Sequence, residues 1–212
     1  MLLPVDAPST SELGEFRAKP GTPQREGVTE MARKTLVIAL VLAATSLVFP
    51  PPAGATVSAV DDPTGDAKGG KDARADITKV GISYVGGTIT LATSVVNPEA
   101  PSSKNWVDGD TSVEWTIFHP DGGEYWANFS GFASGPDASL WTEQDKELCK
   151  ESVKPAFVDG KYTVSFPASC LNNPPKLTIS GDIAYDDIAS GRGKSEDAAP
   201  DDEGECCEVT PS

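Results

Sequence analysis

Three aspartates early in the chain have the type and spacing of a cation site. Asp62 and Asp66 flank the turn-forming residues 63–65, and Asp76 follows a glycine-containing loop. Hard cations such as Ca²⁺ take about six to eight oxygen ligands from carboxylates, backbone carbonyls and water. The loop can supply carbonyls while the three carboxylates supply charge, so these residues predict a calcium site. The alternative is that they only form turns and keep strand edges soluble.

Three tryptophans are candidates for ligand binding. The flat rings of Trp106, Trp126 and Trp141 could stack on a sugar ring while polar neighbours bind its hydroxyl groups. The fourth, Trp115, lies in phase with the apolar residues beside it, which predicts a core position. The alternative is that all four rings belong to the core or cover it, since tryptophan is highly buried on average.

The four cysteines allow three pairings. Cys149 and Cys170 flank a tight turn at residues 159–160, and a hairpin there would bring them together, so we expect them to form a disulfide. Cys206 and Cys207 would form either a bridge between neighbours or a link between two chains. No histidine lies near any cysteine in the sequence, which argues against a catalytic thiol or a zinc site.

The elements that carry these residues are expected to be short strands. Apolar and polar residues alternate with a period of two on either side of Gly86-Gly87 and again around Asp159-Gly160, which is typical of hairpins. About eight such strands and no amphipathic helix predict an all-β fold, an antiparallel β-sandwich of the jelly-roll or immunoglobulin-like kind. A closed barrel is the alternative.

The N-terminal quarter has the layout of an export signal. Residues 31–34 include the basic pair Arg33-Lys34, residues 35–49 are mostly apolar and uncharged, and small residues follow around Ala55. The apolar run is shorter than the roughly 18 residues of a spanning helix, which favours cleavage over a retained anchor. We therefore expect a Sec-type signal peptide at 31–55 and a secreted protein. Residues 1–30 are either a disordered leader or the product of a misassigned start codon.

The rest of the chain divides into a folded part and a tail. Residues 56–185 are expected to form the sandwich, and residues 186–212, poor in apolar side chains, are expected to be a disordered acidic tail. The whole chain has 32 acidic and 17 basic residues and a net charge of −15. This charge repels nucleic acid and anionic membranes, so neither is an expected partner.

The segment around the aspartates resembles a known group of proteins. Residues 62–66 read Asp-Pro-Thr-Gly-Asp and residues 76–80 read Asp-Ile-Thr-Lys-Val. This pattern resembles the opening of secreted bacterial β-sandwich domains related to carbohydrate-binding and DOMON-like modules, and residues 164–171 resemble part of small, mostly uncharacterised exported proteins of high-GC Gram-positive bacteria. The resemblance spans roughly residues 60–185 and implies a sandwich with a structural Ca²⁺ site. Three basic residues in the loop, Lys68, Lys71 and Arg74, depart from it.

Together these features predict a monomeric, non-enzymatic binding module with a structural calcium site and a glycan as its ligand. A protein-interaction or inhibitor module of the cell surface or secretome is one alternative, and a glycan-directed enzyme or its accessory domain is another. The sequence has no Gly-x-Ser-x-Gly elbow and no glycine-rich phosphate loop, so no catalytic residue is assigned.

Overall fold

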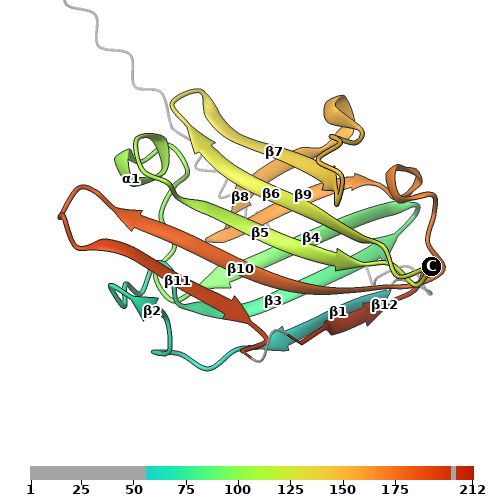
Figure 1. Ribbon diagram of the computed structural model, residues 1–212, viewed down its shortest axis with the longest axis horizontal. Coiled ribbons are helices and arrows are strands. Elements are labelled where there is room, and N and C mark those ends of the chain that lie inside the picture. Colours follow the sequence, from blue (N-terminus) through green and yellow to red (C-terminus); the bar gives the residue numbers. More distant parts are fainter. Residues whose placement is uncertain (1–55, 202–203) are drawn as a thin grey trace, which may run out of the picture. The chain divides into compact units, whose positions relative to one another are not determined.

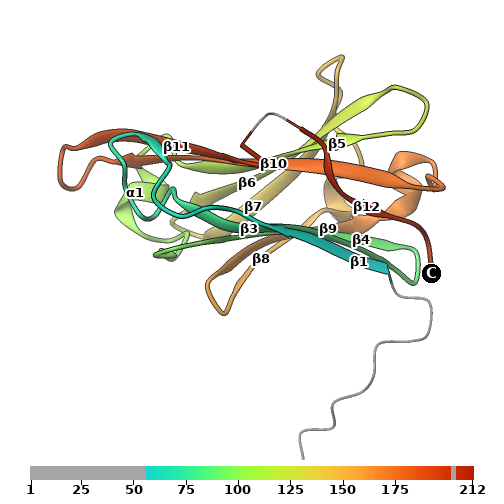
Figure 2. The ribbon, with the colours of Figure 1, turned by 90° about the horizontal axis from the view of Figure 1, so that it is seen from below.

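The structure is a computed structural model that describes residues 56–201 and 204–212. In this part of the chain two antiparallel sheets of five and seven strands pack face to face (Figures 1 and 2). The sheets have separate strand orders, which confirms the predicted sandwich rather than one closed barrel. The expected leader (1–30) and signal peptide (31–55) lie outside the described residues.

The two sheets are assembled from hairpins of neighbouring strands. The five-stranded sheet has the order β1 (Thr56–Asp61), β3 (Ile77–Val85), β4 (Thr88–Val95), β9 (Lys161–Pro167) and β8 (Lys154–Val158). The seven-stranded sheet has the order β2 (Lys68–Gly69), β11 (Gly193–Ala199), β10 (Leu177–Asp187), β5 (Ser112–Phe118), β6 (Glu124–Phe132) and β7 (Gly135–Thr142), and β12 (Cys206–Val209) also pairs with β10. Three short helical turns complete the described residues, α1 (Lys104–Val107), η1 (Lys150–Ser152) and η2 (Ala168–Leu171).

The two predicted hairpin turns have the backbone that their sequences favour. Gly86 and Gly87 have φ values of 57° and 74°, and Asp159 and Gly160 have φ values of 52° and 74°. Two consecutive residues with positive φ are what a two-residue hairpin of type I′ requires. These turns fix the register of β3 with β4 and of β8 with β9.

The core lies between the sheets, where each strand turns every second side chain inward. Trp115, Phe129, Tyr162 and Tyr185 are almost fully buried there. The core position predicted for Trp115 is confirmed, since its exposed fraction is 0%. Alternation with a period of two therefore separates a dry inner face from a wetter outer face on both sheets.

The C-terminal segment is not the disordered tail that the sequence predicted. Strand β10 continues to Asp187, and β11 and β12 follow it; with β1 and β2, the described residues form twelve strands rather than about eight. The inward positions of β11 are Ser195, Asp197 and Ala199, all of them buried. Because two of these three side chains are polar, the strand lacks the apolar alternation by which strands are recognised. Hydrogen bonding to β10 orders it instead.

Candidate metal centre

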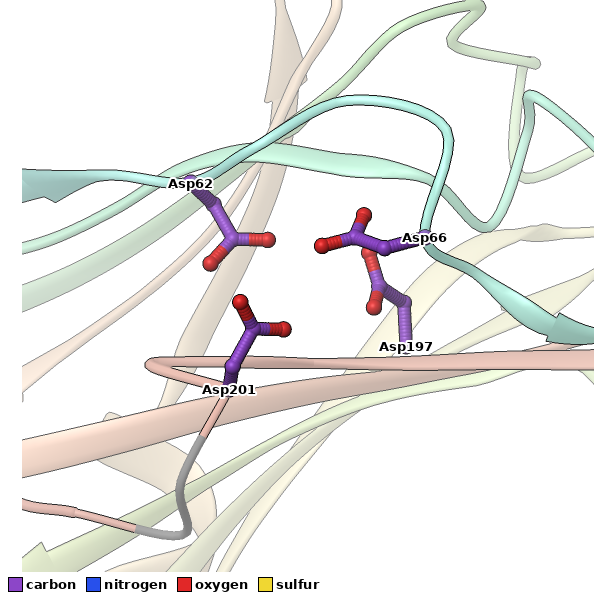
Figure 3. Close-up of side chains that lie close together, drawn as sticks. All are labelled: Asp62, Asp66, Asp197 and Asp201. Atoms are coloured by element: carbon purple, nitrogen blue, oxygen red, sulfur yellow. The ribbon is translucent and has the colours of Figure 1, made fainter.

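Four carboxylates converge between the end of β1 and the end of β11. They belong to Asp62, Asp66, Asp197 and Asp201, which we call the Asp cluster. One oxygen from each side chain lies within 4.8 Å of the corresponding oxygen of every other member. Figure 3 shows the side chains pointing toward a common centre, two from the loop after β1 and two from β11 and the residues after it.

The backbone around the cluster is held by hydrogen bonds. Asp62 follows β1 directly, and its N–H donates to the carbonyl of Thr78 at 3.1 Å. The Asp76 carboxylate accepts the N–H of Gly65 at 3.0 Å and 2.8 Å through its two oxygens. Gly65 has a φ of 90°, a conformation that favours glycine. Asp76 therefore sets the curve of the loop that carries Asp62 and Asp66.

Strand β11 positions the third carboxylate. Asp197 faces the inside of the sandwich, where its Oδ2 accepts the N–H of Ile77 at 2.7 Å. Its Oδ1 accepts the N–H of Ala198 at 3.0 Å. Because Ile77 belongs to the five-stranded sheet and Asp197 to the seven-stranded sheet, this side chain already links the two layers.

The cluster holds oxygens that the protein itself does not satisfy. Asp62 is only 9% exposed, and its Oδ2 is buried without a hydrogen-bond partner among the described residues. The Oδ1 of Asp66 is also buried without a hydrogen-bond partner among the described residues. A buried carboxylate oxygen without a partner loses its hydration and gains nothing in return, which is costly. Both oxygens are suitable ligands for a cation.

The raised pKa values of two members of the Asp cluster also favour a cation site. Burial, then the charges of Asp197 and Asp201, with smaller contributions from Asp66 and Asp76, raise the pKa of Asp62 to about 7 from its ordinary value of 3.8. Burial likewise raises the pKa of Asp197. Like charges in a partly dry site favour protonation, and a bound cation would favour ionisation instead.

The size of the cluster suits calcium. Two oxygens on opposite sides of a Ca²⁺ ion lie about 4.6–5.2 Å apart, which is twice the Ca–O distance. The oxygens of the Asp cluster lie within 4.8 Å of one another, so all four fit one coordination sphere. Four carboxylates leave room for backbone carbonyls or water to complete the six to eight ligands that Ca²⁺ takes.

The structure brings together two of the three aspartates that the sequence singled out. Asp62 and Asp66 belong to the Asp cluster, whereas the carboxylate of Asp76 shapes the loop beside it. The sequence analysis missed Asp197 and Asp201, because both lie in the segment expected to be disordered. No spacing rule links them to Asp62, since they approach it only through tertiary structure, in which β11 pairs with β2 and Asp197 accepts the N–H of Ile77.

The basic residues of the loop do not oppose a cation here. Arg74 forms ion pairs with Asp72 at 2.6 Å and with Asp187 at 2.7 Å, and its guanidinium lies over the ring of Tyr185. Lys68 and Lys71 are exposed. The three basic residues that depart from the resemblance therefore add no positive charge to the Asp cluster, because Arg74 is paired with other aspartates and the two lysines are in solvent.

The three candidate tryptophans occupy two different environments. Trp106 is 2% exposed and packs against Phe129 and Tyr162 in the core, so it has no free ring face for a ligand. The short helix α1 covers one end of the sandwich and directs this ring inward, which a loop assignment could not anticipate. Trp126 and Trp141 are half-buried and stand opposite each other on β6 and β7.

The cysteines pair as the sequence suggested. Cys149 and Cys170 form a disulfide with a Cα–Cα distance of 5.9 Å, which confirms the predicted pairing. Cys206 and Cys207 form a bridge between neighbours, one of the two arrangements that the sequence left open. Both bridges place covalent links in the half of the chain that follows β7.

The comparisons with known proteins identify no family. No model of a known protein family matches the chain, and no curated protein matches it. Within residues 56–201 and 204–212, no helix is long and apolar enough to cross a membrane.

Proposed function

We propose that this chain is an exported, non-catalytic binding module in which the Asp cluster holds a structural Ca²⁺ ion. The observation that carries the proposal is the pair of buried oxygens, Oδ2 of Asp62 and Oδ1 of Asp66, that lack hydrogen-bond partners among the described residues. They lie in a group of four carboxylates of calcium-site dimensions. Without a cation, this group is a concentration of negative charge that weakens the fold.

The position of the ion explains why its role would be structural. Asp62 continues β1 of the five-stranded sheet, and Asp197 belongs to β11 of the seven-stranded sheet. An ion bound to both would tie the two layers together at their shared edge. It would also fix the loop containing Asp66, which otherwise depends on the hydrogen bonds between Gly65 and Asp76.

Export and binding are supported by separate features. The disulfide between Cys149 and Cys170 suits an oxidising compartment, and the residues at 31–55 have the composition of a signal peptide. Extracellular calcium-binding modules have dissociation constants of about 10⁻⁴–10⁻³ M, so a site of low affinity would be occupied outside the cell. A binding role is supported by the tryptophans that remain on the surface, Trp126 and Trp141.

The experiment is calcium titration of the secreted protein. The full chain is expressed in a secreting bacterial host, collected from the medium, stripped with EDTA and titrated with CaCl₂ in a calorimeter. We expect one ion per chain with a dissociation constant of about 10⁻⁴–10⁻³ M, and weaker binding of Mg²⁺, which demands shorter octahedral bonds. The intact mass of the secreted product tests cleavage near residue 55.

The matched control is Asp61→Asn. Asp61 stands beside Asp62, but its side chain is 82% exposed and pairs with Lys79 at 2.7 Å. This variant should bind calcium as the wild type does, whereas Asp197→Asn should bind it weakly. Absence of both binding heat and metal in the purified protein would contradict the proposal.

A further inference from the structure

The outer face of the seven-stranded sheet carries two parallel rows of side chains across its strands. Strands β7, β6, β5 and β10 lie side by side in that order (Figure 1). Their inward side chains fill the core, so the alternate residues face outward. The register places Trp141, Trp126, Thr116 and Ser180 in one row, and Ser139, Asn128, Glu114 and Asp182 in the next.

The tryptophan pair begins the first row. Leu140 and Ala127, the chain neighbours of Trp141 and Trp126, are fully buried, so the two indoles point away from the core. Neither ring is among the partly buried side chains that pack against the core, in contrast to Tyr125 next to them. The Nε1–H of Trp141 donates to Ser139 Oγ at 2.7 Å, which holds the ring in place. The pair is a preorganised apolar surface.

The second row offers hydrogen-bonding groups beside that surface. Asn128 and Glu114 are cross-strand neighbours, and Asp182 stands opposite Glu114 on the next strand. The hydroxyl of Ser130 donates to the Asn128 Oδ1 at 2.7 Å, which orients the amide. The two rows are about 7 Å apart, since they are two residues apart along each strand. Ligand atoms above the rings can therefore reach the carboxyl and amide groups.

The charge of this face restricts what can bind. The four strands contain no lysine, arginine or histidine, while Glu114, Asp182 and three further acids, Glu124, Asp137 and Asp186, face outward from them. A hollow beside Asp182 is lined by Glu196 and by Lys68 of β2, and Lys194 of β11 lies 3.9 Å from Glu196, so the bases stand at the margin of this face. Burial, then Glu114 and Glu196, raise the pKa of Asp182 to about 7. An anionic ligand would meet repulsion here.

We propose that this face binds an oligosaccharide that carries no acidic groups. Trp126 and Trp141 would stack on pyranose rings, and Asn128, Glu114 and Asp182 would accept or donate hydrogen bonds to hydroxyl or amino groups. Three strand spacings make the rows about 14 Å long, enough for a short oligosaccharide. Side chains fixed on a sheet lose little freedom on binding, which favours a flat and rigid partner. This inference names the ligand class of the proposed binding module and is independent of the calcium site.

The test is a set of binding titrations with the full secreted chain. The probes are glucosamine hexamer, N-acetylglucosamine hexamer, cellohexaose, xylohexaose and polygalacturonate. We expect binding of at least one of the four uncharged or amino-bearing hexamers and none of polygalacturonate. Trp126→Ala or Trp141→Ala should weaken that binding about tenfold or more, as expected for a central aromatic contact.

The controls separate loss of a contact from loss of the fold. Val158→Ala removes an exposed apolar side chain from the other sheet and should leave sugar binding unchanged. Trp126→Phe retains an aromatic face and should lose less affinity than Trp126→Ala. The melting temperature of each variant checks that it is folded. A separate calcium titration tests calcium binding by the Asp cluster, so failure of that proposal can be told apart from failure of sugar binding.

Three results would overturn the inference. The first is that no hexamer binds to a correctly folded wild-type chain. The second is that binding persists at full strength in Trp126→Ala and Trp141→Ala. The third is that the chain forms dimers which Trp126→Ala dissociates, because the face would then serve a second copy of this protein.

Discussion

Replacing Asp62 by asparagine should stabilise the calcium-free protein and reduce the further stabilisation that calcium provides. Burial and the neighbouring carboxylates raise the pKa of Asp62 to about 7, so above neutral pH its ionised form weakens the cation-free fold. Asparagine has the same shape without the charge. At pH 8 the EDTA-treated variant should therefore melt at a higher temperature than the EDTA-treated wild type. The same change removes a charged ligand from the cation.

The size of the calcium effect follows from mass action. With about 10 mM CaCl₂ and a dissociation constant of about 10⁻⁴–10⁻³ M, binding stabilises the wild type by about 1.4–2.7 kcal/mol. For a domain of this size, that corresponds to a rise in melting temperature of about 3–11 °C. If Asp62→Asn weakens binding tenfold, the stabilisation falls to about 0.4–1.4 kcal/mol. The calcium-induced shift should then shrink by about half or more.

Differential scanning calorimetry at pH 8, with EDTA or CaCl₂, measures all four states. Asp61→Asn again serves as the control, since its exposed side chain pairs with Lys79 outside the Asp cluster. It should show the wild-type shift with calcium. An Asp62→Asn variant that lowers the melting temperature in EDTA, or that keeps the full calcium shift, would refute the reasoning from burial and repulsion.

Three further predictions address the supports of the site and the surface. Asp76→Ala removes the acceptor that fixes the loop and should weaken calcium binding about 10–100-fold in calorimetric titrations, although the Asp cluster stays intact. Replacing both Cys149 and Cys170 by alanine should cost about 3 kcal/mol and lower the melting temperature by about 6–12 °C, with an unchanged value as the contrary result. A raised pKa means that the stability contributed by Asp182 is complete below about pH 4 and lost as the pH rises through 7, so Asp182→Asn should raise the melting temperature by a few degrees at pH 8 and not at pH 4. Asp137→Asn, at an exposed position of β7, should have no such effect, and equal behaviour of the two variants would count against repulsion as the cause.

The parts of the fold that the sequence predicted are those governed by local rules. Alternation with a period of two identified the strands of the core, and Gly86-Gly87 identified a turn because only residues tolerant of positive φ fit it. The disulfide could be predicted because a hairpin at residues 159–160 brings its two cysteines together. In each case the information lies within a short stretch of chain.

The parts that could not be predicted depend on long-range pairing. Strand β11 turns Ser195 and Asp197 inward, and a polar inner face gives no hydrophobic signal. Its order comes from β10, which shares a ladder with it from Gly181↔Ala199 to Asp187↔Gly193. Because Asp197 lies on β11 and Asp201 lies just after it, the missing strand prediction also concealed half of the Asp cluster.

The positions of the tryptophan rings also depend on tertiary structure that the sequence does not show. Their rings could be assigned to one face or the other of a strand by parity, but the pairing of Trp126 with Trp141 depends on the register between β6 and β7. Trp106 lies in a segment without periodicity, where α1 directs it into the core. Tryptophan as a residue type suggested stacking on a ligand. Only the tertiary structure shows that Trp106 is a core ring and that Trp126 and Trp141 are surface rings.

The two acidic groups of this protein are connected through one strand. Asp197 on the inner side of β11 belongs to the Asp cluster, while Glu196 on the outer side contributes to the raised pKa of Asp182. A rise in pH therefore charges Asp197 on the inner side of β11 and Asp182 on the neighbouring strand β10. A bound Ca²⁺ ion would neutralise only the inner group. On the outer side Lys194 lies 3.9 Å from Glu196, so it is Asp182 that favours protonation or an amino-bearing ligand. Strand β11 thus places one acidic side chain at each of the two proposed sites, Asp197 in the Asp cluster and Glu196 beside Asp182, and separate titrations with calcium and with sugar test the two sites one by one.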